Sequence, residues 1–271
     1  MEIPAVIKMY IRHVIPALLL SLSSATAVAA HYYIAIQPVL PAAQIEKAYE
    51  PLARYLSDKT GHEFSIKSYR NFLTYWARMQ KAENMDFVLD AAHFTDFRVQ
   101  RKNYRILAKF PDTVSFTVVT GEDNFVFEME ELISKRIATM ASPGMGAIRL
   151  IDMFPNPVRL PFYIEASNSV DAVNRVLDGK VDAAIIPSPL VGNYDGLNTV
   201  VSTEPVPHMA MSASPDVPED VALAVKKALL EASKSPQGKK MLEKVNIEYF
   251  EDADARLYAG YAEMLQDVFG Y

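Results

Sequence analysis

The stretch 141–147, with the sequence ASPGMGA, holds the residues best suited to binding a ligand. It lies between an expected strand at 137–141 and an expected helix at 147–153. Glycines let a ligand approach the backbone closely, and the free N–H groups at a helix start point toward anions. A plain tight turn could use the same residues. The turn nevertheless indicates an anion site formed by Ser142, Gly144, Met145, Gly146 and Ala147.

The loops after the other expected strands supply the remaining candidates. Ligands of open α/β sheets bind beyond the carboxyl ends of the strands, so these loops should converge on one cleft. Tyr69, Arg70 and Asn71 follow the second strand, and each candidate also has a structural explanation, such as a helix cap for Asn71 or Asp90. The candidates are Gln37, Tyr69, Asn71, Asp90, His93 and Asn168.

Motifs of catalytic and metal sites are missing from the sequence. The turn lacks the Gly-Lys-Ser/Thr ending of a nucleotide-binding loop and the G-x-G-x-x-G spacing. The five histidines form no H-x-x-x-H pair, and there is no G-x-S-x-G elbow. We therefore expect no catalytic residue, no metal and no cofactor. An exported phosphate-ester hydrolase is the weaker alternative, because phosphoryl transfer needs a metal or a positioned nucleophile.

Short apolar stretches alternate with amphipathic ones along the chain. In the first amphipathic stretch, Ile45, Tyr49, Leu52 and Leu56 are spaced by three and four, and Gly61 can end the helix. Strands are expected at 32–36, 63–68, 86–89, 104–109, 115–120, 137–141, 160–164 and 183–186. Helices are expected at 71–82, 95–100, 130–134, 147–153 and 169–177, and in a tail at 218–234, 236–245 and 253–269. This alternation favours parallel strands covered on both faces, in two α/β units followed by a helical tail.

The composition is that of a folded protein with an acidic surface. Of the 271 residues, 50% are hydrophobic and 22% are charged, which excludes wholesale disorder. The formal net charge of -6 is a poor match for nucleic acid, which binds basic surfaces. The chain has no Cys, which excludes disulfides, thiolate metal sites and cysteine nucleophiles.

Residues 1–30 have the form of a secretory signal peptide. Lys8, Arg12 and His13 precede an apolar run at 14–22, and small residues end the segment with AVAA at 27–30. A membrane anchor is the alternative, but the apolar run is shorter than the roughly 20 residues that a spanning helix needs. We expect cleavage near Ala30 and export of the mature chain to a bacterial periplasm.

Several motifs occur in the order found in one protein family. AYEPLARYL at 48–56 and GKVDAA at 179–184 are the most specific of them. DFVL at 86–89, PVPH at 205–208 and SPQGK at 235–239 support them. In these motifs the chain resembles the periplasmic phosphate/phosphonate-binding proteins, the solute receptors of ABC importers, over nearly its whole mature length.

The resemblance implies the type II periplasmic-binding-protein fold, with two lobes that are each a mixed sheet flanked by helices. Two hinge strands, near 117–121 and 204–210, would join a first lobe of residues 31–119 and 206–271 to a second lobe of residues 120–205. It implies a binding protein and not an enzyme, which holds a small phosphate- or phosphonate-like anion and delivers it to an ABC permease. A sensory receptor for a membrane kinase or cyclase is the alternative role. We expect a monomer.

Three departures from the family's pattern concern the ligand. Pro143 interrupts a turn that is rich in hydroxyl groups in the family and removes one N–H donor. Asn168 stands where the family has a histidine, and Phe94 where it has a tyrosine. A buried anion that lacks a hydrogen-bond partner costs about 1–3 kcal/mol per missing partner. The resemblance therefore identifies the fold more firmly than the ligand.

Overall fold

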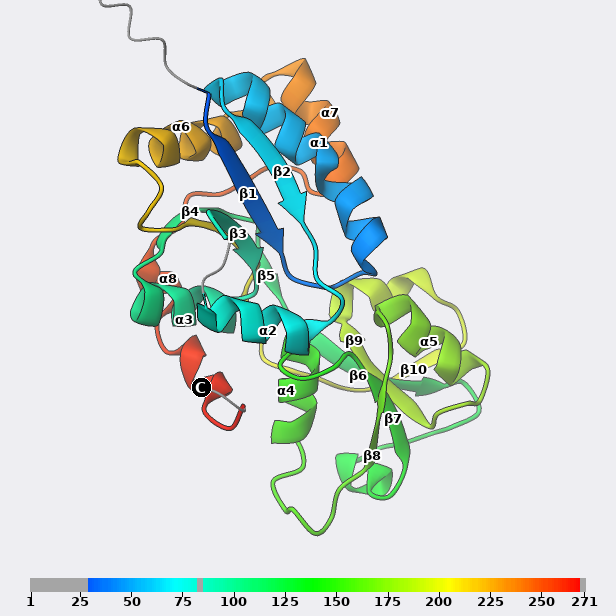
Figure 1. The fold of residues 1–271 in the computed structure, drawn as a ribbon. Coiled ribbons are helices and arrows are strands. Elements are labelled where there is room, and N and C mark those ends of the chain that lie inside the picture. Colours follow the sequence, from blue (N-terminus) through cyan, green and yellow to red (C-terminus); the bar gives the residue numbers. More distant parts are fainter. Residues whose placement is uncertain (1–28, 82–84, 269–271) are drawn as a thin grey trace, which may run out of the picture.

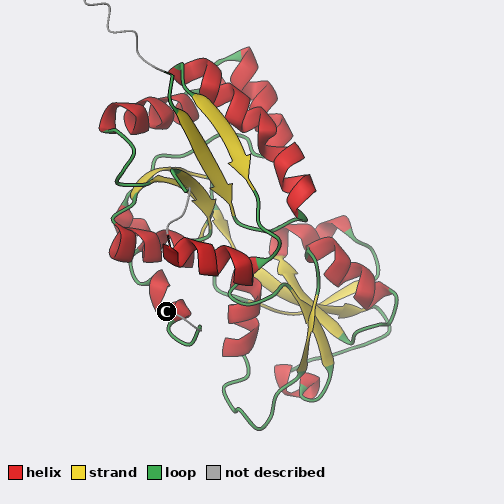
Figure 2. Cartoon of the chain, viewed as in Figure 1, coloured by secondary structure: helices red, strands yellow, loops and turns green. Residues whose placement is uncertain are grey.

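A computed structural model describes residues 29–81 and 85–268 of the chain. The strands form two five-stranded sheets and a two-stranded ladder (Figure 1). The first sheet has the order β2-β1-β3-β12-β4, and the second has the order β10-β6-β9-β7-β8. Each sheet is flanked by helices (Figure 2), so the chain has the mixed α/β architecture expected of it.

The first lobe contains strands from both ends of the chain. Its strands are β1 (His31–Ile36), β2 (Glu63–Lys67), β3 (Phe87–Asp90), β4 (Arg105–Lys109) and β12 (Ala210–Ala213). β1 pairs in parallel with β2 and β3, whereas β12 runs antiparallel between β3 and β4. The sheet is therefore mixed. Its fourth strand, β12, follows the whole of the second lobe in the sequence.

Helices cover both faces of the first sheet. They are α1 (Ala42–Thr60), α2 (Phe72–Lys81), α3 (Ala92–Lys102), α6 (Glu219–Leu230), α7 (Pro236–Val245) and α8 (Ala255–Tyr258), with short 3-10 turns η3 (Ala232–Lys234) and η4 (Tyr261–Leu265). Ile34 and Ile36 pack with α1, α6 and α7, whereas Ala35 packs with α2 and α3. This alternation follows from the two-residue period of a strand.

The second lobe is formed by one continuous stretch of chain. Its strands are β6 (Phe116–Gly121), β7 (Arg136–Thr139), β8 (Phe162–Glu165), β9 (Ala183–Pro187) and β10 (Leu197–Ser202). Its helices are α4 (Met145–Asp152) and α5 (Ser169–Leu177), with 3-10 turns η1 (Met129–Leu132) and η2 (Ser188–Asn193). β7 is parallel to β8 and β9, and β6 is antiparallel to β9 and β10. α4 and α5 lie on opposite faces of this sheet.

A short ladder joins the two lobes. β5 (Thr113–Val114) pairs antiparallel with β11 (Val206–Pro207). The first crossing was expected at 117–121, but those residues belong to β6 of the second sheet. The reason is that residues 116–119 alternate between the two cores of the second lobe, with Val118 in one and Val119 in the other. The expected lobe boundary between residues 119 and 120 therefore falls inside β6.

The tail differs from the expected third helical stretch at 253–269. α8 ends at Tyr258, and a separate 3-10 turn, η4, follows it. Gly260 lies between them with a left-handed φ of 93°, which breaks the helix. Residue 269 lies outside the described residues. η4 packs on α3, so the described part of the tail returns to the first lobe.

A buried ion pair connects the third strand to the third helix. Arg98 Nε donates to Asp90 Oδ2 at 2.9 Å, and both side chains are fully buried. The Tyr75 hydroxyl donates to the same carboxylate oxygen at 2.6 Å, and burial raises the pKa of Tyr75 well above its usual value. This network fixes the start of α3, which faces the second lobe.

Asp90→Asn should destabilise the fold by about 3 kcal/mol, because it leaves the buried Arg98 guanidinium without a counter-charge. Urea unfolding of the purified protein measures this loss. Glu50→Gln is the control, since the Glu50–Arg54 pair is 60% and 69% exposed and such pairs contribute less than about 1 kcal/mol. Equal stabilities of the two variants would contradict the expectation.

Candidate functional site

A cavity of about 230 Å³ lies between the two lobes. Its first-lobe wall is formed by the segments that follow β1 and β2, and its second-lobe wall by the segments that follow β7 and β8. The lining residues are Pro38, Pro41, Arg70, Asn71, Phe72, Met140, Ala141, Glu165, Ala166 and Ser167. The cavity is therefore at the carboxyl ends of strands from both sheets, where α/β proteins bind ligands.

The glycine turn at the start of α4 is packed against the first lobe. A Cβ placed on Gly144 would lie 3.1 Å from the nearest ring carbon of Phe72 and 3.0 Å from the Ala141 carbonyl oxygen. Only glycine fits this approach without a shift of its neighbours. The Phe72 ring therefore covers Gly144, while α4 lies directly below α2 in Figure 1. Met145 is 5% exposed and packs in the apolar cluster that contains Phe116, whereas Ala147 is 4% exposed and lines a groove between α4 and β8.

Gly146 faces a different neighbour. A Cβ on this residue would lie 3.3 Å from the ring of Phe116, which belongs to the core of the second lobe. A side chain at Gly146 would therefore press on that core and lower stability. Packing against Phe116 within the second lobe therefore accounts for the glycine at position 146.

His93 joins the lobes through a hydrogen bond. Its Nε2 lies 2.8 Å from the Pro143 carbonyl oxygen and must carry the hydrogen, because a carbonyl can only accept. The ring is fully buried, and burial, with a smaller contribution from Arg149 of α4, lowers the pKa of His93 to about 4. His93 is thus neutral near pH 7, and its N–H is already used by Pro143.

Three predicted site residues are buried in the first lobe, where they serve its internal structure. Gln37 Oε1 accepts a hydrogen bond from the Ala91 N–H at 3.0 Å and so holds the start of α3. Asp90 is fully buried in its pair with Arg98. Tyr69 is 6% exposed, with its ring edge-on to that of Tyr75 at 5.1 Å. None of these three side chains lines the inter-lobe cavity.

The two predicted asparagines are helix caps. Asn71 Oδ1 accepts from the Thr74 N–H at 2.9 Å and begins α2, and Asn168 Oδ1 accepts from the Asp171 N–H at 3.0 Å and begins α5. Asn71 also lines the inter-lobe cavity. Ser142 is exposed and lines an adjoining groove between α4 and β8.

Residues outside the predicted set line this cavity. Arg70 and Glu165 are exposed and lie on opposite walls, Arg70 from the first lobe and Glu165 from the second. Ser167 also lines the cavity, but its hydroxyl donates to Asp171 Oδ2 at 3.1 Å. Arg70 lies three residues after the end of β2, so the strand-end rule contained the signal that could have found it. Glu165 ends β8 in the same way.

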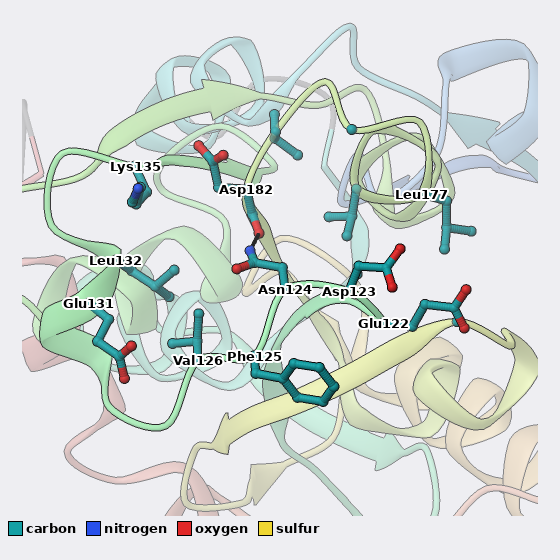
Figure 3. A pocket seen from close by; sticks show the side chains of 15 residues that line it. Glu122, Asp123, Asn124, Phe125, Val126, Glu131, Leu132, Lys135, Leu177 and Asp182 are labelled. Carbon is teal, nitrogen blue, oxygen red and sulfur yellow. Dashed lines mark hydrogen bonds between the residues drawn. The ribbon is translucent and has the colours of Figure 1, made fainter.

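A larger cavity, of about 560 Å³, lies elsewhere in the second lobe (Figure 3). It is lined by acidic residues that include Glu122 and Asp123, and Asn124 Nδ2 donates to the Asp182 carbonyl oxygen beside it at 3.0 Å. It lies next to the amino ends of β7 and β9, opposite the cleft. None of the predicted site residues lines it, and its acidic walls disfavour an anion.

The described residues contain no cluster of three or more His, Asp or Glu side chains that could hold a metal ion. Within the same ranges, no helix combines the length and the apolar character of a membrane span. The expected signal segment at 1–30 falls almost entirely outside the described residues.

The pH dependence of stability should report on His93. Its pKa is about 4 in the folded protein, whereas an exposed histidine titrates near about 6.5. The neutral ring therefore supports the folded state fully above about pH 6.5. This support is lost as the pH falls toward 4, by up to about 3 kcal/mol at 1.4 kcal/mol per pKa unit.

His93→Gln is the matched variant, because a glutamine N–H can still donate to Pro143 but takes up no proton. Urea unfolding at about pH 7 and about pH 4.5 should show that the native protein loses more stability than His93→Gln. His208, whose pKa is also lowered to about 4 by burial, is present in both proteins and cancels. Identical pH dependences would mean that His93 titrates as an exposed group.

Comparisons with known proteins give one family match. Residues 34–258 match the sequence profile of the family described as ABC transporter, phosphonate, periplasmic substrate-binding protein. No curated protein sequence matches the chain.

Solved structures of the same fold cover almost all of the described chain. PhnD1 from Prochlorococcus marinus in complex with methylphosphonate is 14% identical, with a TM-score of 0.75, over 87% of this chain and 97% of that chain. A binding-protein component of an ABC phosphonate transporter from Pseudomonas aeruginosa is 13% identical, with a TM-score of 0.70, over 85% and 83%. A Xanthomonas citri protein bound to ATP is 13% identical, with a TM-score of 0.70, over 88% and 99%.

These likenesses establish the type II periplasmic-binding-protein fold, which agrees with two mixed sheets joined by a short ladder. The family is one of substrate-binding transport proteins and not of enzymes. Because the profile match covers most of the sequence, the chain belongs to the phosphonate-binding family of periplasmic ABC-transporter substrate-binding proteins.

Proposed function

We propose that the protein captures a small phosphonate- or phosphate-like anion between its lobes and delivers it to an ABC importer. The observation that carries the proposal is the inter-lobe cavity with Arg70 on its first-lobe wall. A guanidinium binds the oxygens of a phosphoryl group through paired hydrogen bonds. Residues 1–30 act as the export signal in this proposal and are removed.

Both lobes form walls of this anion site, but its hydrogen-bond donors come from the first lobe. Arg70 and the Asn71 amide extend from that lobe, whereas the Ser167 hydroxyl of the second lobe already donates to Asp171. Because the cavity has walls from each lobe, a ligand that contacts both favours the closed form over the open one. A binding protein that signals occupancy to a membrane partner by closing needs this arrangement.

In this proposal, the turn after β7, residues 141–147, contacts the anion only while the two lobes are apart. When the first lobe withdraws, Phe72 and His93 leave the turn, and the N–H groups of Met145, Gly146 and Ala147 face the cleft. These groups and the Ser142 hydroxyl would then meet an entering anion. Closing with a small ligand would return Phe72 to Gly144, with the ligand retained at Arg70.

Arg70→Gln should weaken the binding of methylphosphonate by about tenfold to a hundredfold, because charge-assisted hydrogen bonds contribute about 1.5–3 kcal/mol. Isothermal titration calorimetry against phosphate, phosphite and methylphosphonate provides the measurement. Arg54→Gln, an exposed change on α1, is the control and should leave the affinity unchanged. If folded, ligand-free native protein binds none of the three oxyanions, the proposed function is wrong.

Glu165→Gln tests the opposite wall of the same cavity. The Glu165 carboxylate repels an anion held at Arg70, so its removal should tighten methylphosphonate binding several-fold. The effect should shrink at high salt, because Glu165 is exposed. Unchanged affinity at low salt would place the anion away from Glu165.

A further inference from the structure

A second hollow adjoins the inter-lobe cavity in the second lobe. This groove has a volume of about 260 Å³, and α4 and β8 form its sides. Its floor is the end of β7 and the residues after it. The lining residues are Thr139, Met140, Ala141, Ser142, Ala147, Ile151, Tyr163 and Glu165.

The groove exists because the outer strand of the second sheet is incompletely covered. β8 lies at the edge of the sheet, and Tyr163 and Glu165, two residues apart, share its α4 side. Tyr163 is 37% exposed and Ile151 of α4 is 45% exposed. Two large apolar side chains thus border an open groove, where water contacts them in the unoccupied protein.

The groove is continuous with the inter-lobe cavity. Met140, Ala141 and Glu165 line both, so the two hollows share part of one wall. A ligand whose charged group is held at Arg70 can therefore extend along Met140 toward Ile151. The groove holds roughly eight water-sized groups of about 30 Å³ each, which is enough for a hexyl chain or a phenyl ring.

The cavity is lined by one positive and one negative side chain, so an apolar contact can contribute to the affinity for a ligand. The carboxylate of Glu165 opposes the guanidinium of Arg70, so the two formal charges of the lining cancel. Pro143 offers no N–H, and Phe72 covers Gly144. The net electrostatic attraction at this site is therefore reduced, and burial of apolar surface adds to the affinity that the hydrogen bonds of Arg70 provide.

Resting on the function proposed above, we propose that the ligand is an oxyanion with an apolar substituent, an alkyl chain of several carbons or an aryl group. The anionic end binds at Arg70 and Asn71. The substituent lies in the groove between α4 and β8, against Ala147, Ile151 and Tyr163. The groove thus sets the preference of the protein for substituted phosphonates over methylphosphonate or phosphate.

Calorimetric titration of the native protein with methyl-, butyl-, hexyl- and phenylphosphonate tests the proposal. Affinity should rise by about twofold for each added methylene up to hexyl, roughly half the value for full burial, because the groove is open on one side. Phenylphosphonate should bind more tightly than methylphosphonate. Equal affinities for methyl- and hexylphosphonate would overturn the inference and leave the anion-binding function intact.

A pair of matched variants locates the substituent. Ile151→Gln should weaken hexylphosphonate binding by about fivefold or more and change methylphosphonate binding by less than about twofold. Leu257→Gln is the control, because Leu257 is 43% exposed on α8, away from the groove. Equal effects of the two variants on hexylphosphonate would overturn the placement in the groove. Failure of every phosphonate to bind would overturn the proposed function itself, and the inference with it.

Discussion

The packing of the Pro143–Gly144 turn against the first lobe determines which parts of the cleft can hold a ligand. The Phe72 ring covers Gly144, and His93 donates to the Pro143 carbonyl. Ile148 of α4 enters the apolar cluster that α2 and α3 form with the first sheet. These contacts exclude water from the centre of the interface, so the polar space that is left lies at its margin, beside Arg70.

The strand and helix order was largely predictable, because local signals and tertiary packing agree for most elements. α5 and α7 begin and end where expected, since Asn168 and Ser235 cap their first turns. β12 was not expected, because its sequence, AMSA, has little strand preference and pairing with β3 and β4 determines its structure. The broken tail depends on the left-handed Gly260, which helical periodicity does not reveal.

The candidate site was harder to predict, because polar residues at strand ends have two uses that look alike in a sequence. Asp90 and Gln37 follow the expected pattern of ligand residues, yet Arg98 and the Ala91 N–H occupy them. These partners are known only when the lobe is folded. The predicted set contains Tyr69 and Asn71 but not Arg70, although Arg70 is the residue of the three that brings a charge to the cavity.

The position of β12 between β3 and β4 affects the order in which the two lobes can fold. The first sheet is incomplete until residues 210–213 arrive, so about 100 residues of intervening chain must emerge before that lobe can close. The second lobe, from β6 to β10, has all its strands in one continuous segment. As the chain emerges, the second lobe can therefore acquire its structure earlier, while β3 and β4 lack the strand that pairs with both of them.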